Sequence, residues 1–422
     1  MDFGFFKELL SIDSTSGKER EVALWLHRRL EAPQKELMEV GDGTLNLLLS
    51  WGTPRVVFCT HMDTVPPYIA PVFPEDIITD GTPFASLPPA PPTFFEGGSA
   101  PLLSPCGSRP SMSSDNVQGH GLRRRSAERC GSSAEPIVVK GRGACDAKGQ
   151  ILALYTACKA LEAEECTDFG LLLLAGEETG SWGAKAFSKT GFEAPFLIIG
   201  EPTENKVVSA SKGTLSYDLT FTGEAFHSGY PQYGVSAVEL FNQFYNALKA
   251  QDFGVDPELG ETTWNVGLLH SDNPQNILSP ELTCRVYFRT TFVSHQAVQD
   301  WMEQWSEAMP AAAGRPYPGF CDSKNIEGEK AAGDSRGQRP LKATARGGDR
   351  PARYVTLPGF PSAPAAFGSD APHLTGFGHK IICGPGSIRH AHRPDEQITV
   401  EELSTAVSQY IRMYHQLVEA AV

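Results

Sequence analysis

Apolar residues along the first half of the chain predict short strands that alternate with helices. Continuous apolar runs of strand length occupy residues 56–60, 170–175 and 196–200, as is typical of strands buried in a sheet. Residues 3–10 and 148–162 read as helices, the second without proline. Strands separated by helices indicate a largely parallel α/β sheet. Sites in such sheets form just beyond the carboxyl ends of the strands.

Three further segments extend the α/β prediction toward both ends of the chain. Ser16, with Glu19 three residues later, predicts the start of a second helix through a capping box. Residues 380–383 read as another strand, and residues 400–420 read as a closing helix. The first and last parts of the chain are therefore expected to form one domain.

The pattern changes at about residue 214, where apolar residues alternate with polar ones as far as Phe221. Such alternation predicts a half-buried strand. The segments that follow read in turn as helix, strand, strand and helix: 236–250, 264–270, 282–288 and 296–308. This order predicts a separate α+β domain at 211–312, inserted into a catalytic domain that occupies 1–210 and resumes over 313–422.

Two stretches interrupt these patterns. Residues 84–135 contain a proline cluster, then Ser/Gly-rich sequence and a run of three arginines, and residues 322–353 are polar, rich in Gly, Arg and Lys, and without period. Both compositions predict disordered insertions. The arginine run has a second interpretation as a targeting element or a contact for an acidic partner.

Composition narrows the class of protein. A chain of 422 residues, 41% hydrophobic, predicts two globular domains. An excess of 50 acidic over 36 basic residues argues against a nucleic-acid or anionic-membrane surface. Nine cysteines without a CxxC pair do not form a disulfide framework, and no apolar window reaches membrane-span length. With no signal pattern at the N-terminus, we expect a cytoplasmic protein.

Histidines and carboxylates follow the predicted strand ends. Some come directly after the apolar runs, one lies in the glycine-rich GRGACDAKG loop and one in GPGSIRHAHRPDE; in chain order they are His61, Asp63, Asp146, Glu177, Glu178, Glu201 and His392. Imidazoles with several carboxylates, one of which can bridge, are what a site for two zinc-like ions needs. The set predicts a hydrolase that uses metal-bound water.

The residues alone leave simpler interpretations open. His61 and Asp63 form a His-x-Asp pair that also arises by chance, and Asp146 could cap the helix that follows it. Adjacent glutamates such as Glu177 and Glu178 are common in exposed loops. His390 competes with His392 as a ligand. In the predicted second domain, His227, Asn276 and Arg289 are candidate site residues that could equally be structural.

Seven segments resemble, in order, those of a known zinc-dependent family. They are THMDTVPP, GRGACDAKG, LLLLAGEETG, IIGEPTENKVVSASKGTL, AFHSGYPQYGVSAVEL, FGSDAPHL and GPGSIRHAHRPDE. The family includes acetylornithine deacetylase, succinyl-diaminopimelate desuccinylase, aminoacylase and glutamate carboxypeptidase, and the resemblance is closest to acetylornithine deacetylase-like members. It implies a zinc-exopeptidase-like catalytic domain with a mostly parallel mixed sheet, plus an inserted ferredoxin-like lid and dimerisation domain.

The resemblance also implies a site for two Zn²⁺ ions, for which Co²⁺ can substitute. His61 and Glu201 would bind one ion, Glu178 and His392 the other, and Asp146 would bridge them. The family pattern His-x-x-Asp/Glu-Glu favours His392 over His390, since it is completed by Asp395 and Glu396.

The remaining roles implied by the resemblance concern catalysis and substrate. Asp63 would hold His61, and Glu177 would act as general base and acid. His227 would help bind the oxyanion, reaching the partner subunit's site in a homodimer formed through the lid domain. Residues expected to approach substrate are Asn276, Arg289, Ser369 and Asp370.

The expected reaction is hydrolysis of an amide in a small N-acyl amino acid or short peptide. Gly200 followed by Glu201 resembles the deacylase branch, so N²-acetylornithine is the leading substrate, with Arg289 or Lys212 binding its carboxylate. The alternatives are a dipeptidase or carboxypeptidase of the same family and a non-catalytic relative that binds other proteins.

Overall fold

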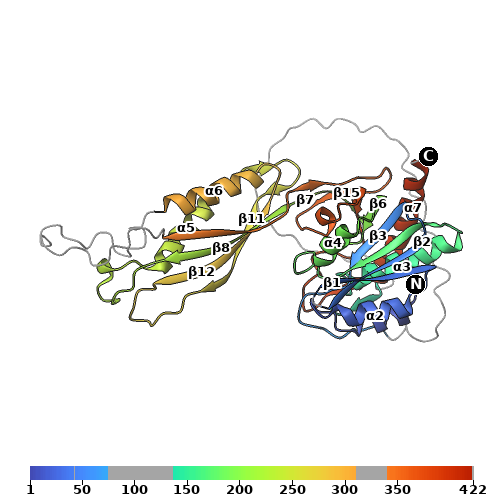
Figure 1. The fold of residues 1–422 in the computed structure, drawn as a ribbon, viewed down its shortest axis with the longest axis horizontal. Helices are drawn as coiled ribbons and strands as arrows, with labels where there is room; N and C mark the ends of the chain where they lie inside the picture. Colours follow the sequence, from blue (N-terminus) through green and yellow to red (C-terminus); the bar gives the residue numbers. More distant parts are fainter. Residues whose placement is uncertain (42, 75–135, 310–339, 421–422) are drawn as a thin grey trace, which may run out of the picture.

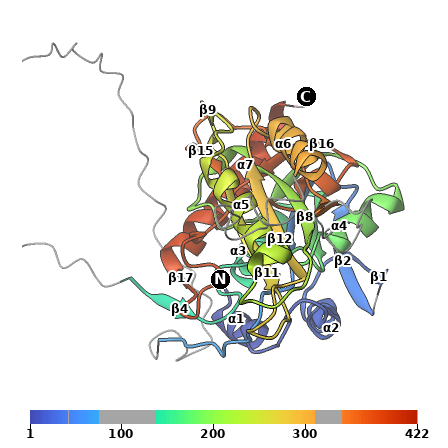
Figure 2. The ribbon, with the colours of Figure 1, turned by 90° about the vertical axis from the view of Figure 1, so that its left-hand side faces the viewer.

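The computed structural model describes residues 1–41, 43–74, 136–309 and 340–420. They form two bodies joined by a narrow connection, with the inserted segment at one end of the long axis (Figure 1). In Figure 2 the inserted segment lies in front of the larger, catalytic part. The predicted insertion at 84–135 lies outside the described residues.

The catalytic part is built on a six-stranded sheet that is mixed and mostly parallel, as predicted. Four neighbouring strands pair in parallel, whereas β1 and β2 are joined to them by antiparallel pairing, so that β2 alone runs against the other five. The order across the sheet is β1 (Gln34–Gly41), β2 (Thr44–Gly52), β5 (Asp168–Leu174), β3 (Val56–His61), β6 (Ala194–Ile199) and β16 (Phe377–Ile382). The four parallel strands are those that the apolar runs predicted, whereas β1 and β2 were not predicted.

Helices cover both faces of this sheet. On β3, Val56 and Phe58 pack into one apolar cluster, and Val57 and Cys59 pack into the other. The larger cluster is closed by α1 (Phe3–Leu10), α2 (Glu19–Arg29), α3 (Lys148–Ala163) and α7 (Val400–Ala420). The short helix α4 (Trp182–Phe187) contributes to the opposite cluster. Burial on both faces explains why these strands read as continuous apolar runs.

The predicted capping box is wrong. Helix α2 begins at Glu19, and no side chain caps it. Ser16 Oγ donates instead to Asp63 Oδ2 at 2.9 Å, and Glu19 Oε2 accepts the Gly17 amide at 2.7 Å. The Ser16 hydroxyl therefore serves the strand end at Asp63 rather than the helix start.

The inserted segment is an α+β domain with a four-stranded antiparallel sheet. The strand order is β11 (Thr263–His270), β12 (Glu281–Thr290), β8 (Gly213–Thr222) and β13 (Leu341–Gly347). Helices α5 (Ala237–Ala250) and α6 (His295–Ala308) pack on one face, and the other face is open. Chain order β8-α5-β11-β12-α6-β13 with this strand order is the expected ferredoxin-like arrangement.

The prediction of disorder over 322–353 is wrong for its last part. Residues 341–347 form β13, the fourth strand of the inserted sheet, and Ala352–Arg353 form β14. Most β13 side chains are exposed, so the strand is held by backbone hydrogen bonds to β8 and leaves no apolar period in the sequence. Residues 322–339 lie outside the described part of the chain.

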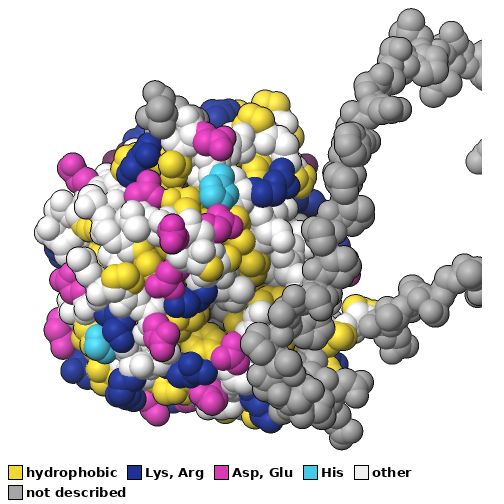
Figure 3. All heavy atoms as spheres, turned by 90° about the vertical axis from the view of Figure 1, so that its right-hand side faces the viewer, with side chains coloured by type: hydrophobic (Ala, Val, Ile, Leu, Met, Phe, Trp, Pro, Cys, Tyr) yellow, Lys and Arg dark blue, Asp and Glu magenta, His cyan; other side chains and the backbone are white. Residues whose placement is uncertain are grey.

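Small sheets connect the two bodies and close the site. β7 (Val207–Ser211) pairs with β14 and with β15 (Ser362–Ala365), and β4 (Val138–Lys140) pairs with β17 (Gln397–Thr399). A two-residue pair, β9 (Val255–Asp256) with β10 (Gly260–Glu261), completes the strands. On the catalytic face that points away from the inserted domain, acidic, basic and apolar side chains are interspersed (Figure 3). Within the described ranges, every helix is too short or too polar to cross a membrane.

Candidate active site

A cleft lies where the catalytic sheet meets the near end of the inserted sheet. The catalytic wall carries carboxylates and histidines, among them Asp146, Glu177, Glu178, Glu201 and His392. The opposite wall comes from β8, β12 and β13 and includes Ser216, Tyr287, Arg289 and Arg346. The cleft measures about 570 Å³, which is the size of a small-molecule or short-peptide site.

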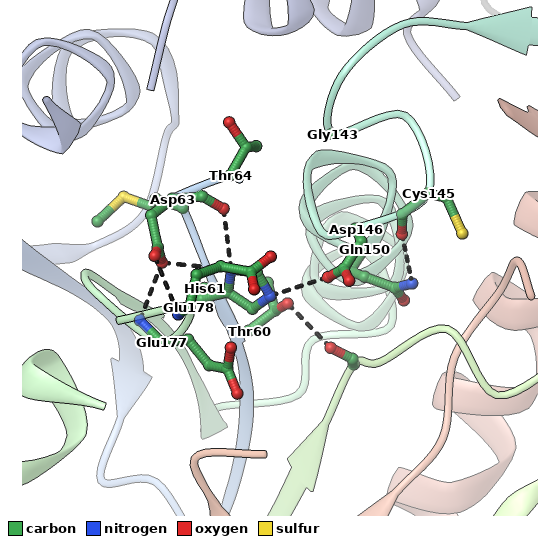
Figure 4. A network of polar contacts seen from close by, with 12 residues as sticks. Thr60, His61, Asp63, Thr64, Gly143, Cys145, Asp146, Gln150, Glu177 and Glu178 are labelled. Atoms are coloured by element: carbon green, nitrogen blue, oxygen red, sulfur yellow. Dashed lines mark hydrogen bonds and ion pairs between the residues drawn. The ribbon is translucent and has the colours of Figure 1, made fainter. Parts of the chain in front are cut away.

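Asp63 organises the base of the cleft. This fully buried carboxylate lies 3.3 Å from His61 Nδ1 and accepts the backbone amides of Glu177 and Glu178 at 3.0 and 3.1 Å (Figure 4). Ser16 supplies a fourth contact. Burial raises the pKa of Asp63, but its contacts with His61 outweigh this and lower the pKa below its usual value. One carboxylate thus fixes the ring of His61 and the backbone of both glutamates.

Asp146 lies between the two histidines. Its Oδ1 is 3.0 Å from His61 Nε2, and its Oδ2 is 3.3 Å from His392 Nε2. His392 Nε2 also lies 2.9 Å from Glu178 Oε1. Hydrogen bonds to Asp146 and Glu178 raise the pKa of His392 to about 10. Each oxygen of Asp146 therefore faces a different imidazole, which is the placement expected of a bridging carboxylate.

The other carboxylates of the cleft lie close together, and few positive charges offset their negative charge. Burial raises the pKa of Glu177 and of Glu201 well above the usual value, and repulsion among the clustered carboxylates adds to the effect. Asp370 is 3% exposed, its pKa is raised by burial to about 6, and its Oδ1 has no hydrogen-bond partner. Buried carboxylates repel one another unless a cation or a proton is shared.

This donor set fits a divalent metal. Ligand atoms of His61, Asp146 and Glu178 lie within 4.8 Å of one another. Imidazole nitrogen and carboxylate oxygen are ligands of zinc and similar ions. Glu201 lies close enough to repel this cluster, and His392 contacts it directly. The five predicted metal ligands are therefore brought together, with Asp146 at their centre.

Sequence reasoning missed a role for Glu396. Its fully buried carboxylate accepts the backbone amides of Gly143, Cys145 and Asp146 at 2.9, 3.1 and 3.0 Å, and it pairs with Arg142 at 2.6 Å. These bonds hold the glycine-rich loop in the shape that presents the Asp146 side chain. The only signal in the sequence was a carboxylate close to His392, which does not indicate a partner about 250 residues earlier.

The predicted substrate residues divide into two groups. Arg289 and Ser369 line the cleft, and Asp370 is buried beside its carboxylates. His227 and Asn276 are not among the lining residues; they lie together at the far end of the inserted sheet, where the Ser228 amide donates to the Asn276 carbonyl at 2.8 Å. Lys212, the other candidate for the substrate carboxylate, does not line the cleft, and its ammonium donates to the Glu261 carbonyl. His390, the other candidate metal ligand, does not line the cleft either, whereas His392 does.

Comparison with known proteins gives the same architecture. Residues 209–315 match the M20 peptidase dimerisation domain. A probable carboxypeptidase of Aspergillus niger is 32% identical over 307 residues, covering 68% of this chain and 67% of that protein. A probable carboxypeptidase of Aspergillus clavatus is 26% identical, covering 96% and 86%. The crystal structure of an M20 family metallo-carboxypeptidase from Sulfolobus solfataricus superposes with a TM-score of 0.59 at 15% identity, covering 99% of both chains.

The sequence matches and the structural match agree. Identity to the A. niger protein extends over two thirds of both chains, and the inserted domain matches by its own sequence. The cluster of imidazole and carboxylate groups could hold a metal ion, in keeping with a metallo-hydrolase. The chain belongs to the M20 family of metallopeptidases and is a hydrolase of that family.

Proposed function

We propose that this hydrolase is a metallo-carboxypeptidase that removes the C-terminal residue of short peptides. The observation that carries the proposal is the unpaired Arg289 guanidinium, which faces the carboxylate cluster across the cleft. Within the described residues the Arg289 guanidinium forms no ion pair. It lies over the Tyr287 ring, 5.0 Å from the ring centroid, in a cation–π contact. A guanidinium is suited to a carboxylate in a bidentate geometry.

In this proposal the donor groups would hold two metal ions, with Asp146 contributing to both. His61 and Glu201 would hold one ion, and Glu178 and His392 the other. When bound, such ions supply Lewis acidity to a water molecule and to the scissile carbonyl. The relatives named as probable carboxypeptidases support peptide substrates. Zinc would suit this set of imidazole nitrogens and carboxylate oxygens.

Glu177 is positioned to move the protons. Its amide is held by Asp63, so its side chain is directed into the cleft beside the metal ligands. Its raised pKa makes its carboxylate a stronger base than an ordinary glutamate. It would take a proton from the attacking water and return it to the amine that leaves.

We propose that His227 helps to bind the oxyanion that forms on a substrate in the cleft of a second subunit. It lies at the far end of the inserted sheet, in the part that matches the dimerisation domain. Two copies related by a twofold axis would each present this histidine to the other's cleft. We therefore propose a homodimer in which each site is completed by its partner.

Deacylation of an N-acyl amino acid is the second candidate. Such a compound also offers a free carboxylate to Arg289, and Glu201 follows the strand end as in the deacylase branch of the resemblance. A panel of N-blocked dipeptides, unblocked dipeptides and N²-acetylornithine, assayed with zinc or cobalt on the full chain, separates the two. Release of the C-terminal residue from blocked dipeptides is expected. Turnover of acetylornithine alone would reject the carboxypeptidase assignment.

A further inference from the structure

The narrow connection between the two bodies (Figure 1) contains two chain segments that cross in close contact. Gly213 begins β8, and Gly348 directly follows β13. A Cβ atom on Gly213 would lie 2.5 Å from the Asp349 carbonyl oxygen, and a Cβ atom on Gly348 would overlap the Thr214 carbonyl oxygen. Both positions therefore need glycine, because the two segments pass each other backbone to backbone.

Asp349 attaches the start of β8 to this crossing. Its backbone carbonyl accepts the Thr214 amide at 2.8 Å, and its own amide donates to Thr214 Oγ1 at 3.0 Å. Thr214 lies opposite Arg289 in the pairing of β8 with β12. Asp349 is therefore linked, through one residue, to the end of the cleft wall that carries Arg289.

The side chain of Asp349 reaches the opposite wall of the cleft. Its Oδ1 lies 3.3 Å from His373 Nε2, and both residues line the cleft. The hydrogen bond from His373 lowers the pKa of Asp349 below its usual value despite the opposing effect of burial, and Lys185 adds to this lowering. The two side chains thus form a strut between the inserted domain and the catalytic domain.

His373 is held firmly on the catalytic side of this strut. Its amide donates to the Asp370 carbonyl at 3.0 Å, and its carbonyl accepts the Ser188 hydroxyl. The same segment presents Ser369 to the cleft. Because hydrogen bonds to the backbone fix both ends of the strut, the contact between Asp349 and His373 sets the spacing of the two walls.

We propose that Asp349 and His373 are positioning residues that hold Arg289 at a fixed distance from the carboxylate cluster across the cleft. This inference rests on the carboxypeptidase function proposed above. A substrate that is bound at its carboxylate and at its scissile amide must match the spacing of the two walls. Neither side chain of the strut has to contact the substrate for this role.

The matched control is the ion pair of Arg353 with Glu258, at 3.1 Å, which also joins the connecting sheet to the inserted domain but does not line the cleft. Full-length, metal-loaded Asp349→Ala, His373→Ala and Arg353→Gln are compared with wild type on N-acetyl-Ala-Ala. The first two should raise KM by about 10-fold, since a misplacement of about 1 Å can cost up to about 100-fold. Their kcat should change little, as for a loss of uniform binding, and Arg353→Gln should change neither constant.

Two further variants test whether the strut acts through Arg289. Adding Asp349→Ala to Arg289→Gln should cause no further rise in KM, because the group that the strut positions is already absent. His373→Lys, which restores a cation beside Asp349, should return KM toward the wild-type value. A rise in KM that persists in the Arg289→Gln background, or that Arg353→Gln shares, overturns the inference.

Amide hydrogen exchange separates this inference from the proposed function, because it needs no substrate. The Thr214 and Asp349 amides should exchange faster in His373→Ala than in wild type, and Arg353→Gln should leave their rates unchanged. If wild type releases no C-terminal residue, the carboxypeptidase function fails, and the exchange rates alone decide whether the strut holds the wall. Unchanged rates at both amides, or faster rates without a rise in KM on a substrate that is turned over, overturn the inference.

Discussion

The two domains differ in how firmly the protein holds their functional side chains. In the catalytic domain, Asp63 and Glu396 are fully buried, and each carboxylate accepts several backbone amides that fix the residues around the metal-type cluster. In the inserted domain, Arg289 has no charged partner among the residues that the structure describes, and His227 is exposed. Catalytic groups need fixed geometry, whereas recognition groups must stay free for a ligand or a second subunit.

The inserted domain also separates its candidates by distance. Arg289 pairs with Thr214 at the near end of β8, and His227 follows the far end. Strand β8 has 10 residues, which corresponds to roughly 30 Å at about 3.3 Å per residue. His227 therefore does not share a site with Arg289 of the same chain, and the comparison predicts one site completed by two chains.

The largest effect on turnover is expected for a substitution in the catalytic domain, where hydrogen bonds fix the site residues. Glu177→Gln should lower kcat by about 10²-fold to 10⁴-fold, because it removes the proton acceptor while Asp63 still holds the backbone amide. Metal content, measured by atomic absorption, should remain that of the wild type. A variant that keeps near-normal turnover would show that another group moves the proton.

A slightly smaller effect is expected at the far end of the inserted sheet. His227→Ala should lower kcat by about 10²-fold to 10³-fold, the usual cost of losing one oxyanion donor. Mixing it with inactive Glu177→Gln chains should restore activity, because one site of each mixed dimer then holds both residues. No recovery after verified subunit exchange would contradict a site shared between chains.

The same contrast explains what the sequence could predict. The strands β3, β5, β6 and β16 were predictable because burial leaves apolar runs, and their polar ends converge for topological reasons. Strand β13 was not, because its side chains are mostly exposed and its position depends on backbone pairing.

Residues that act through distant partners were equally hidden. Glu396 bonds to backbone amides about 250 positions earlier, and Arg346 reaches the cleft because backbone pairing places β13 beside β8. Neither of these long-range contacts leaves a pattern in the sequence around the residue. His61 and Glu178, in contrast, were found because His61 ends the buried strand β3 and Glu178 lies in the loop after the buried strand β5.

The third prediction tests whether the catalytic domain depends on buried support. Glu396→Gln leaves Arg142, which is 2% exposed, without its ionic partner, and should lower the free energy of unfolding by about 3 kcal/mol. Zinc affinity should fall as well, because the loop that presents Asp146 is loosened. Asp395→Asn is the control: Asp395 is exposed and pairs with the exposed Arg393, so its effect should stay within about 0.5 kcal/mol. Equal effects of the two variants in urea unfolding would deny Glu396 this role.

The smallest effect concerns pH and metal removal, and it should arise in the catalytic domain alone. Burial raises the folded pKa of Glu177, Glu201 and Asp370, so chelated protein loses stability as pH rises above the unfolded values near 4–4.5. Contacts with Asp146 and Glu178 raise the pKa of His392 to about 10, so its stabilising charge is present below about 6.5 and is lost as pH rises toward 10. Both changes have the same sign between pH 5 and 7; above pH 7 they are opposed by Lys148, because burial lowers its pKa to about 7. Urea unfolding with chelator should therefore show a loss of about 1–2 kcal/mol across this window, and added zinc should reduce the slope, since the cation compensates the clustered carboxylates. An equal slope with and without zinc would mean that these groups do not hold the ion.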